Sequence, residues 1–342
     1  MKVVPLDSIS LGMRLGQNIY RNDGLLALPK GAVIHKRERD TLRFHQLEFV
    51  LILEENDRYG TKENDLNTSL NILESAYKKC SLWDEAFGDK LYENISRKIL
   101  KKKKLQKYIN KLRTIDSYSY AHCINVSMVV ASLLHVHYQV DEHLSDLVLL
   151  ALLHDIGRIK LDNIFNKDGK LNGDEFEQLK KHPILSYNML KGLGFSKHEL
   201  KFVVETHENW DGSGYPAKLE KEEISELAQL IFIADVYNAL SSYRPYRGIY
   251  APYDIVQIIE GEKNKMFGES YIAFFLDRFM PYPVGTKVEL NNGHHAVVVK
   301  VREGKKMLPL VETVCEKTGE RIELIDLSQH QGLRILRINA SY

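Results

Sequence analysis

The stretch that decides the fold is residues 206–216, which read THENWDGSGYP. It combines a histidine, two carboxylates, two glycines, a tryptophan, a tyrosine and a proline, a mixture that no hydrophobic core needs. Glycine permits backbone conformations that side chains forbid, and Pro216 stiffens the end of the stretch. A turn of this kind usually holds polar groups at a surface cleft. We therefore ask which site His207 points into.

Around this stretch, the composition is that of an ordinary folded protein. The 342 residues favour one large domain with smaller additions. The formal net charge is +1, from 47 Lys and Arg against 46 Asp and Glu, so nothing indicates a nucleic-acid polymer or an anionic membrane as partner. Residues 147–153 form the longest aliphatic run, which is too short for a membrane span. Three scattered cysteines and no signal-peptide pattern predict a cytoplasmic protein.

The pattern along the chain predicts four parts. Residues 1–55 read as a small mixed α/β module, in which an Asn-Asp-Gly turn at 22–24 separates two strand-like runs. The module is either a structural addition or a sensor or dimerisation unit. Residues 56–112 read as a linker and a helical segment, and residues 282–342 as a small β-rich extension with hairpin turns.

The fourth part, residues 113–281, is strongly helical. Val126, Val130 and Leu134 belong to one apolar stripe, and residues 144–153 and 227–240 form two further apolar helices. Gly157 reads as the terminator of the first of these two helices, because it follows residues 144–153. The fold class is therefore predicted to be mainly α, with a helical bundle core and small flanking modules.

Six polar residues lie inside or at the ends of these apolar helices: His122, His154, Asp155, His182, His207 and Asp235. A buried carboxylate is costly unless it is paired or bound to a metal. Four imidazoles and two carboxylates exceed the needs of one open metal site and suit two. Two adjacent cations activate water and clamp a phosphate. From the residue types alone, scattered core histidines are an equally good interpretation, and the order of the residues decides between the two.

That order resembles the HD-GYP family, the HD-domain metal phosphohydrolases that degrade the bacterial messenger cyclic di-GMP. The resemblance runs from about residue 115 to residue 281. The matching pieces are His122, HDIG at 154–157, Leu171 with Glu175, His182-Pro183, His207-Glu208, DGSGYP at 211–216, ADVYNAL at 234–240 and RPYR at 244–247. The Tyr282–Gly285 segment and the N-terminal module also look like the flanks of such proteins.

The resemblance implies a role for each matching residue. The first metal would be held by His122, His154, Asp155 and Asp235, and the second by Asp155, His182 and His207, with Asp155 bridging. Iron or manganese is the usual metal of the family. Arg158 would grip the scissile phosphate, and Tyr215, Arg244 and Arg247 would contact the nucleotide and its phosphates. From the residues alone, Arg244 and Arg247 also suit a helix end, where they complement its dipole.

The implied activity is hydrolysis of cyclic di-GMP to pGpG, with GMP as a further product, by a hydroxide activated by two metals. Three positions differ from the family pattern. Thr206 replaces the first of two successive histidines, Arg158 replaces a lysine, and Tyr118 replaces a glutamate that accompanies a third metal. The alternatives are a receptor or interaction protein of HD-GYP fold without turnover, and a phosphohydrolase for another nucleotide. A homodimer is expected by analogy only.

Overall fold

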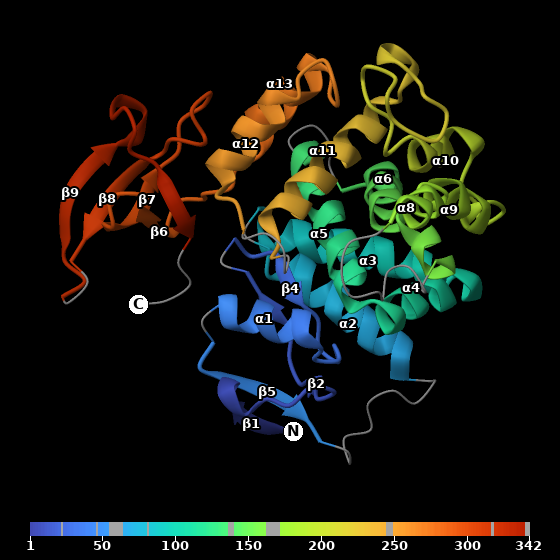
Figure 1. Cartoon of the computed structure of the whole chain (residues 1–342), viewed down its shortest axis with the longest axis horizontal. Helices are drawn as coiled ribbons and strands as arrows, with labels where there is room; N and C mark the ends of the chain where they lie inside the picture. The colour runs from blue at the N-terminus through green and yellow to red at the C-terminus, as the bar shows by residue number, and fades with distance from the viewer. Residues whose placement is uncertain are drawn as a thin grey trace.

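The computed structural model describes residues 1–21, 23–45, 47–54, 64–80, 82–135, 140–161, 172–243, 249–315 and 318–338. Helices dominate these residues, and small sheets lie toward both ends of the chain, which confirms the predicted fold class. Figure 1 shows the helices as one body, with the N-terminal module below it and the C-terminal sheet to its left. No helix in the described ranges has both the length and the apolar character needed to cross a bilayer.

Within the described residues, the first half of the helical body contains five helices, and three of them begin at a capping aspartate. They are α2 (Asn64–Lys78), α3 (Glu85–Leu100), α4 (Lys103–Ile115), α5 (Ser117–Leu134) and α6 (Glu142–Leu153). The side chains of Asp84, Asp116 and Asp141 accept main-chain N–H groups in the first turns of α3, α5 and α6. The helical segment predicted within residues 56–112 is divided among three helices, α2, α3 and α4.

The second half supplies most of the functional site. It comprises the short 3-10 turns η2 (Ile156–Lys160) and η3 (Lys221–Glu223), and the helices α8 (Gly173–Leu179), α9 (His182–Leu190), α10 (Lys197–Val204), α11 (Glu226–Ser241), α12 (Pro252–Gly261) and α13 (Glu269–Arg278). Asn172 caps α8 by accepting the N–H of Glu175. Pro183 lies in the first turn of α9.

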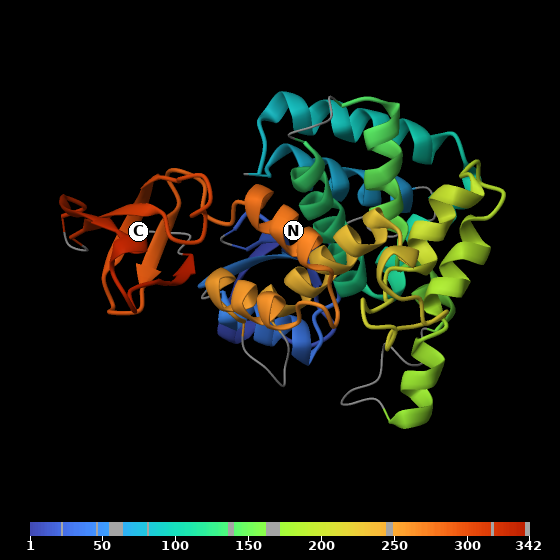
Figure 2. The same ribbon diagram turned by 90° about the horizontal axis from the view of Figure 1, so that it is seen from above.

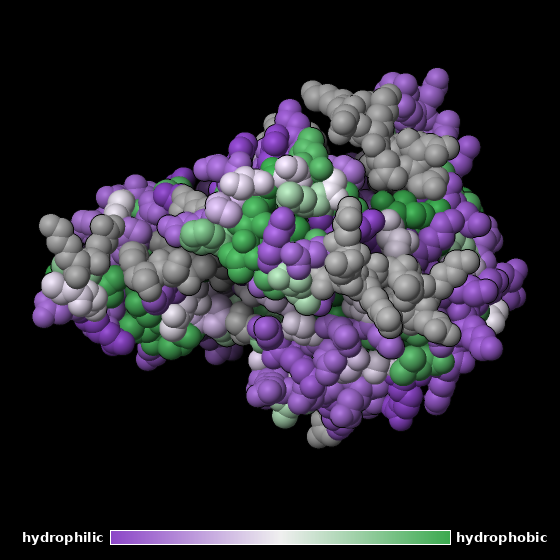
Figure 3. Space-filling view, turned by 90° about the horizontal axis from the view of Figure 1, so that it is seen from below, coloured by the Kyte–Doolittle hydropathy of each residue, from purple (hydrophilic) through white to green (hydrophobic). Residues whose placement is uncertain are grey.

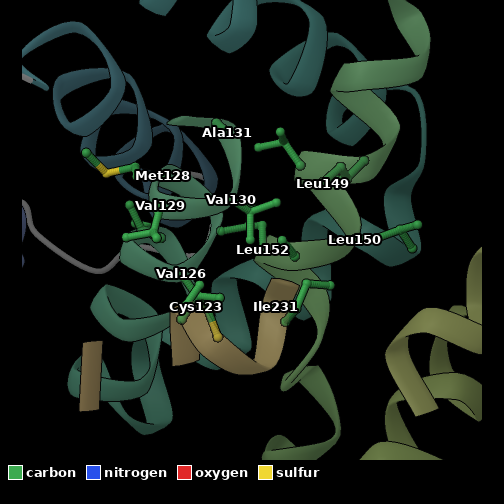
Figure 4. Close-up of a cluster of buried hydrophobic side chains, with 14 of the residues drawn as sticks. Cys123, Val126, Met128, Val129, Val130, Ala131, Leu149, Leu150, Leu152 and Ile231 are labelled. Carbon is green, nitrogen blue, oxygen red and sulfur yellow. The ribbon is translucent and has the colours of Figure 1, made fainter. Parts of the chain in front are cut away.

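The main hydrophobic core lies where α5 packs against α6 and α11. Helix α5 is buried on nearly every side, because its sequence offers no polar face. Figure 4 shows Val126 and Val130 of α5 beside Leu149 and Leu152 of α6, with Ile231 of α11 close by. These side chains are at most 1% exposed. This tight packing fixes the positions of α5, α6 and α11, and with them His122, His154 and Asp235.

The N-terminal module packs against this body through a hairpin. Its elements are β1 (Lys2–Pro5), η1 (Leu6–Ser8), β2 (Arg14–Leu15), β3 (Ile19–Tyr20), β4 (Leu26–Leu28), α1 (Lys36–Phe44) and β5 (Phe49–Leu53). Antiparallel strands β1, β5 and β2 form one sheet, and β3 pairs with β4 in the predicted hairpin. Leu28 joins the module's own core, whereas Leu25 and Leu26 join the main helical core. Figure 1 shows β4 reaching up to α5.

The C-terminal end forms a five-stranded antiparallel sheet in the order β10-β6-β7-β8-β9. The strands are β6 (Lys287–Leu290), β7 (His295–Lys300), β8 (Leu310–Val314), β9 (Arg321–Asp326) and β10 (Ile335–Ile338), with the turn η4 (Leu327–Gln329). This sheet has its own hydrophobic core, and Figure 2 shows it at one end of the molecule. The face in Figure 3 is mostly hydrophilic, with separate apolar patches.

Candidate metal centre

The structure brings all six of the predicted metal-ligand residues into one cluster. His122 lies within α5, His154 follows α6, Asp155 precedes η2, His182 begins α9, His207 follows α10 and Asp235 lies within α11. All but Asp235 are less than 9% exposed, and the Asp235 side chain is 14% exposed. Residues separated by more than one hundred positions in the sequence therefore meet in a single buried polar site.

Asp155 lies at the middle of the cluster. Its Oδ1 is 2.9 Å from Nε2 of His182 and 3.8 Å from Nε2 of His207. On the other side, its Oδ2 is 3.4 Å from Nε2 of His154 and 3.8 Å from Nε2 of His122. Asp155 thus belongs to two groups of three potential ligands, and within each group the ligand atoms lie within 4.8 Å of one another.

Asp235 extends the first group. Its Oδ1 lies 2.9 Å from Nε2 of His122. Burial by itself would raise the pKa of Asp235, but its hydrogen bond and attraction to His122 lower that pKa below the ordinary value. The pKa of Asp155 is also held well below its ordinary value, against the effect of burial, by Arg158 and His154. Both carboxyl groups are therefore ionised, which favours a bound cation.

Two of the histidines are oriented by main-chain carbonyls. Nδ1 of His154 lies 2.7 Å from the carbonyl oxygen of Ala151, and Nδ1 of His182 lies 2.7 Å from that of Leu179. A carbonyl only accepts hydrogen bonds, so Nδ1 carries the proton in both rings. Each Nε2 therefore directs a lone pair into the cluster, as a metal-binding histidine must.

The donor set fits divalent cations. Apart from the ion pair with Arg158, neither oxygen of Asp155 has a hydrogen-bond partner among the residues that the structure describes, and neither does Nε2 of His154. Such buried unpaired atoms are costly unless a ligand binds them. Imidazole nitrogens with carboxylate oxygens suit borderline divalent metals. The cluster can accordingly hold metal ions.

Arg158 lies against the same carboxylate. Its Nη2 is 2.7 Å from Oδ2 of Asp155, and its side chain is 19% exposed. It comes from η2, one turn after Asp155. A guanidinium at this point offers N–H donors at the edge of the cluster, where a phosphate oxygen would find both the arginine and the metals.

Gly157 allows η2 to approach α9. A Cβ at this position would lie 2.2 Å from the carbonyl oxygen of His182 and 2.6 Å from the nitrogen of Ser186. The main-chain N–H of Gly157 also donates to Oγ of Ser186, at 2.8 Å. The sequence suggested that Gly157 terminates a helix, but α6 already ends at Leu153. The glycine is needed instead for the close contact that sets Asp155 against His182.

The stretch 206–216 closes back on His207. The N–H of Tyr215 donates to the carbonyl oxygen of His207 at 3.1 Å, and the two rings stack with centroids 5.2 Å apart. Gly214 permits this return, because a Cβ there would lie 2.2 Å from the nitrogen of Asn209. The Glu208 carboxylate accepts the N–H groups of residues 217 and 219, which fixes the far end of the loop.

Thr206 lies away from the cluster, and the predicted phosphate-binding arginines are not among the described residues. Thr206 is buried, and its Oγ1 donates to the carbonyl oxygen of Val203 at 3.1 Å, so it belongs to neither ligand group. Arg244 and Arg247, predicted to bind phosphate, lie outside the described residues.

Sequence reasoning missed the groups behind His122. Nδ2 of Asn238 lies 2.7 Å from Nδ1 of this ring, and Arg21 of the N-terminal module lies 3.3 Å from the other end of the same amide. One signal was available in the sequence. Asn238 follows Asp235 by three positions in an apolar helix, and this spacing places both on one face.

Comparison with known proteins gives matches over the same region. The model of the family described as HD domain matches residues 94–270. A cyclic di-GMP phosphodiesterase of Pseudomonas aeruginosa is 32% identical over 227 residues, covering 66% of this chain and 54% of the relative. A 3'3'-cGAMP-specific phosphodiesterase of Vibrio cholerae is 30% identical over 166 residues, covering 46% of this chain and 31% of the relative. The match thus spans about half or less of these relatives' lengths.

One solved structure, described as a HDG"Y"P protein from Bdellovibrio bacteriovorus, has a TM-score of 0.39 and 15% identity, covering 80% of this chain and 97% of the other.

Proposed function

The chain belongs to the HD domain family, and on that premise we propose that it is a metal-dependent phosphodiesterase that hydrolyses cyclic di-GMP to pGpG. The observation that carries the proposal is the position of Asp155, which is shared by two buried groups of potential metal ligands. The printed activity of the Pseudomonas relative supports the choice of substrate. Iron or manganese is the proposed metal, because nitrogen and oxygen donors suit either ion.

The chain's own residues would each have a separate role in the reaction. Two bound cations would supply an activated water and neutralise phosphate charge. Asp155 holds the two ligand groups together, and the Ala151 and Leu179 carbonyls keep two imidazoles in the tautomer that offers a lone pair. Arg158 orients a non-bridging phosphate oxygen at the edge of the cluster. Tyr215, stacked on His207, forms a wall against the nucleotide.

Thr206 bears on the rate rather than on the reaction class. Its hydroxyl is engaged with the Val203 carbonyl, so the second group keeps three protein ligands. Three ligands leave open positions for water and substrate, which catalytic sites require. This supports an enzyme over a receptor without turnover. Three further points remain predictions: GMP as a further product, the cytoplasmic location and a homodimer.

The experiment is a product assay with matched controls. Full-length protein loaded with Mn²⁺ or Fe²⁺ under reducing conditions is incubated with cyclic di-GMP, and the products are separated by chromatography. We expect pGpG from the wild type and none from an Asp155→Asn variant. No linear product from metal-loaded wild type would reject the enzyme, and calorimetric binding of intact cyclic di-GMP would then support the receptor.

A second substrate is favoured by one specific observation. The Vibrio relative is specific for 3'3'-cGAMP, as its name states. The same assay should therefore include 3'3'-cGAMP at equal concentration. Faster turnover of that nucleotide would move the assignment from cyclic di-GMP to the mixed dinucleotide while leaving the metal centre unchanged.

A further inference from the structure

His122 differs from the other oriented histidines in what lies behind its ring. Main-chain carbonyls lie behind His154 and His182, and they accept a proton from Nδ1. Behind His122 lies the side-chain amide of Asn238, whose Nδ2 is 2.7 Å from Nδ1. An amide has one donating end and one accepting end, so its orientation determines which ring nitrogen of His122 carries the proton.

The neighbours of Asn238 settle that orientation. Asn125 is fixed by the main chain of β4, since its Oδ1 accepts the N–H of Leu26 at 2.9 Å and its Nδ2 donates to the Leu26 carbonyl at 2.9 Å. The same Nδ2 lies 3.2 Å from Oδ1 of Asn238. Nη1 of Arg21 lies 3.3 Å from that oxygen. Both neighbours can only donate at these atoms, so the amide oxygen faces them and its NH₂ group faces His122.

This arrangement gives His122 the opposite tautomer from the other two rings. A ring that accepts a hydrogen bond at Nδ1 carries its proton at Nε2, and Nε2 lies 2.9 Å from Oδ1 of Asp235. A metal ligand must offer a lone pair at Nε2. His122 therefore becomes a ligand only if its proton moves to Nδ1 and Asn238 turns its oxygen toward the ring.

Rotation of the Asn238 amide is unfavourable because of contacts with the N-terminal module. Turning the amide would present its NH₂ group to Arg21 and to Asn125, so donors would face donors. Arg21 is held in place, because it is 8% exposed, is paired with Asp23 and donates to Oγ of Ser242 at 3.2 Å. A small cavity lined by Arg21, Asn238 and His122 lies along this connection.

We propose that Asn238 is a positioning residue through which the N-terminal module weakens metal binding by His122. While Arg21 and Asn125 hold its amide oxygen, the first ligand group lacks one lone pair, and withdrawal of Arg21 permits the metal-binding orientation. The inference rests on the proposed metal centre and adds a control of its occupancy. The ligand that is controlled is a divalent cation, and the control acts before any substrate binds.

The test is calorimetric titration of metal-free, full-length protein with Mn²⁺. Asn238→Asp places acceptor oxygens toward both Arg21 and His122, so we expect Mn²⁺ to bind the first group about tenfold more tightly. Arg21→Met removes one of the two opposing donors and should tighten binding by about threefold, given the single weak hydrogen bond involved. Arg14→Met is the matched control, because exposed Arg14 bonds within the module to the Gly31 carbonyl, and its affinity should equal that of the wild type.

Equal or weaker Mn²⁺ binding by both Asn238→Asp and Arg21→Met would overturn the inference while leaving the proposed function intact. Failure of every protein to bind Mn²⁺ would overturn both. A second readout does not depend on the variants. Long-range ¹H–¹⁵N spectra of the metal-free wild type should show His122, identified by its loss in His122→Gln, protonated at Nε2. Protonation at Nδ1 would contradict the inference.

Discussion

At the scale of single residues, Asp155 is the group on which both ligand sets depend. Asp155→Asn should abolish turnover and weaken Mn²⁺ binding at both positions, because the change removes the shared charge. Asp235→Asn is the comparison, since the Asp235 carboxylate pairs with His122 of the first ligand group. That variant should lose the equivalent of Mn²⁺ bound by the first group and keep the one bound by the second. Loss of both equivalents in Asp235→Asn, measured by metal analysis after dialysis, would contradict the division into two groups.

Thr206 gives a second prediction at this scale. Because its hydroxyl bonds to the Val203 carbonyl and not to the cluster, Thr206→Val should leave Mn²⁺ stoichiometry unchanged. The lost hydrogen bond should lower the free energy of unfolding by about 1 kcal/mol, measured by urea denaturation. Thr206→Ser keeps the hydroxyl and serves as the control. A fall in metal content in the valine variant would show that Thr206 is a ligand after all.

Much of the site could be predicted from single residues in their local context. Each ligand candidate stands out as a polar residue within or beside an apolar helix, and Asp155 does so next to His154. The link from Arg21 to Asn238 could not be predicted, because these residues are 217 positions apart and meet only through tertiary packing. Thr206 stands where the family pattern has a histidine, and the sequence shows only that replacement. Its buried hydrogen bond to the Val203 carbonyl could be seen only in the structure.

At the scale of elements, the contact between η2 and α9 sets the geometry of the cluster. Gly157→Ala would place a Cβ 2.2 Å from the His182 carbonyl oxygen, so the two elements must separate. We expect a loss of about 1 to 3 kcal/mol in the free energy of unfolding, as for other overpacked sites, together with weaker Mn²⁺ binding. Gly173→Ala is the matched control, since a Cβ there meets no atom within 4 Å. Equal stability of the two variants would contradict the role given to Gly157.

Element positions followed the sequence where capping and periodicity were strong. The start of α8 at Asn172 and the β3–β4 hairpin agree with their local signals. Strand β9 alternates polar and apolar residues at 321–324, yet Ile322 and Leu324 are 68% and 58% exposed, so which face is buried could not be predicted from this alternation. The helices α2, α3 and α4 were predicted as one helical segment, since no proline separates them in the sequence.

At the scale of the whole molecule, the N-terminal module is joined to the helical body beside the metal centre. His45 follows α1 near this junction, where Phe44 contacts Tyr243 with ring centroids 5.6 Å apart. Burial lowers the pKa of His45 to about 4, and the charge of Arg21 adds to this effect. The folded protein therefore keeps His45 neutral over a pH range in which the unfolded chain protonates it.

The sign of the resulting pH dependence follows from that difference. As the pH falls from about 6.5 to about 4, the unfolded state takes up a proton that the folded state refuses, so the free energy of unfolding decreases. A His45→Gln variant should lose less stability than the wild type over this range in urea denaturation. Parallel curves for the two proteins would rule out a contribution from His45.

The match to the HD domain family and the phosphodiesterase relatives confirm the family that the motif order indicated. The proposed activity depends on the candidate metal centre, and anomalous X-ray diffraction from crystals grown with Mn²⁺ tests that centre most directly. We predict two manganese peaks, one on each side of the Asp155 carboxylate, the first beside His154 and the second beside His182. A single peak, or manganese bound only away from Asp155, would contradict the account.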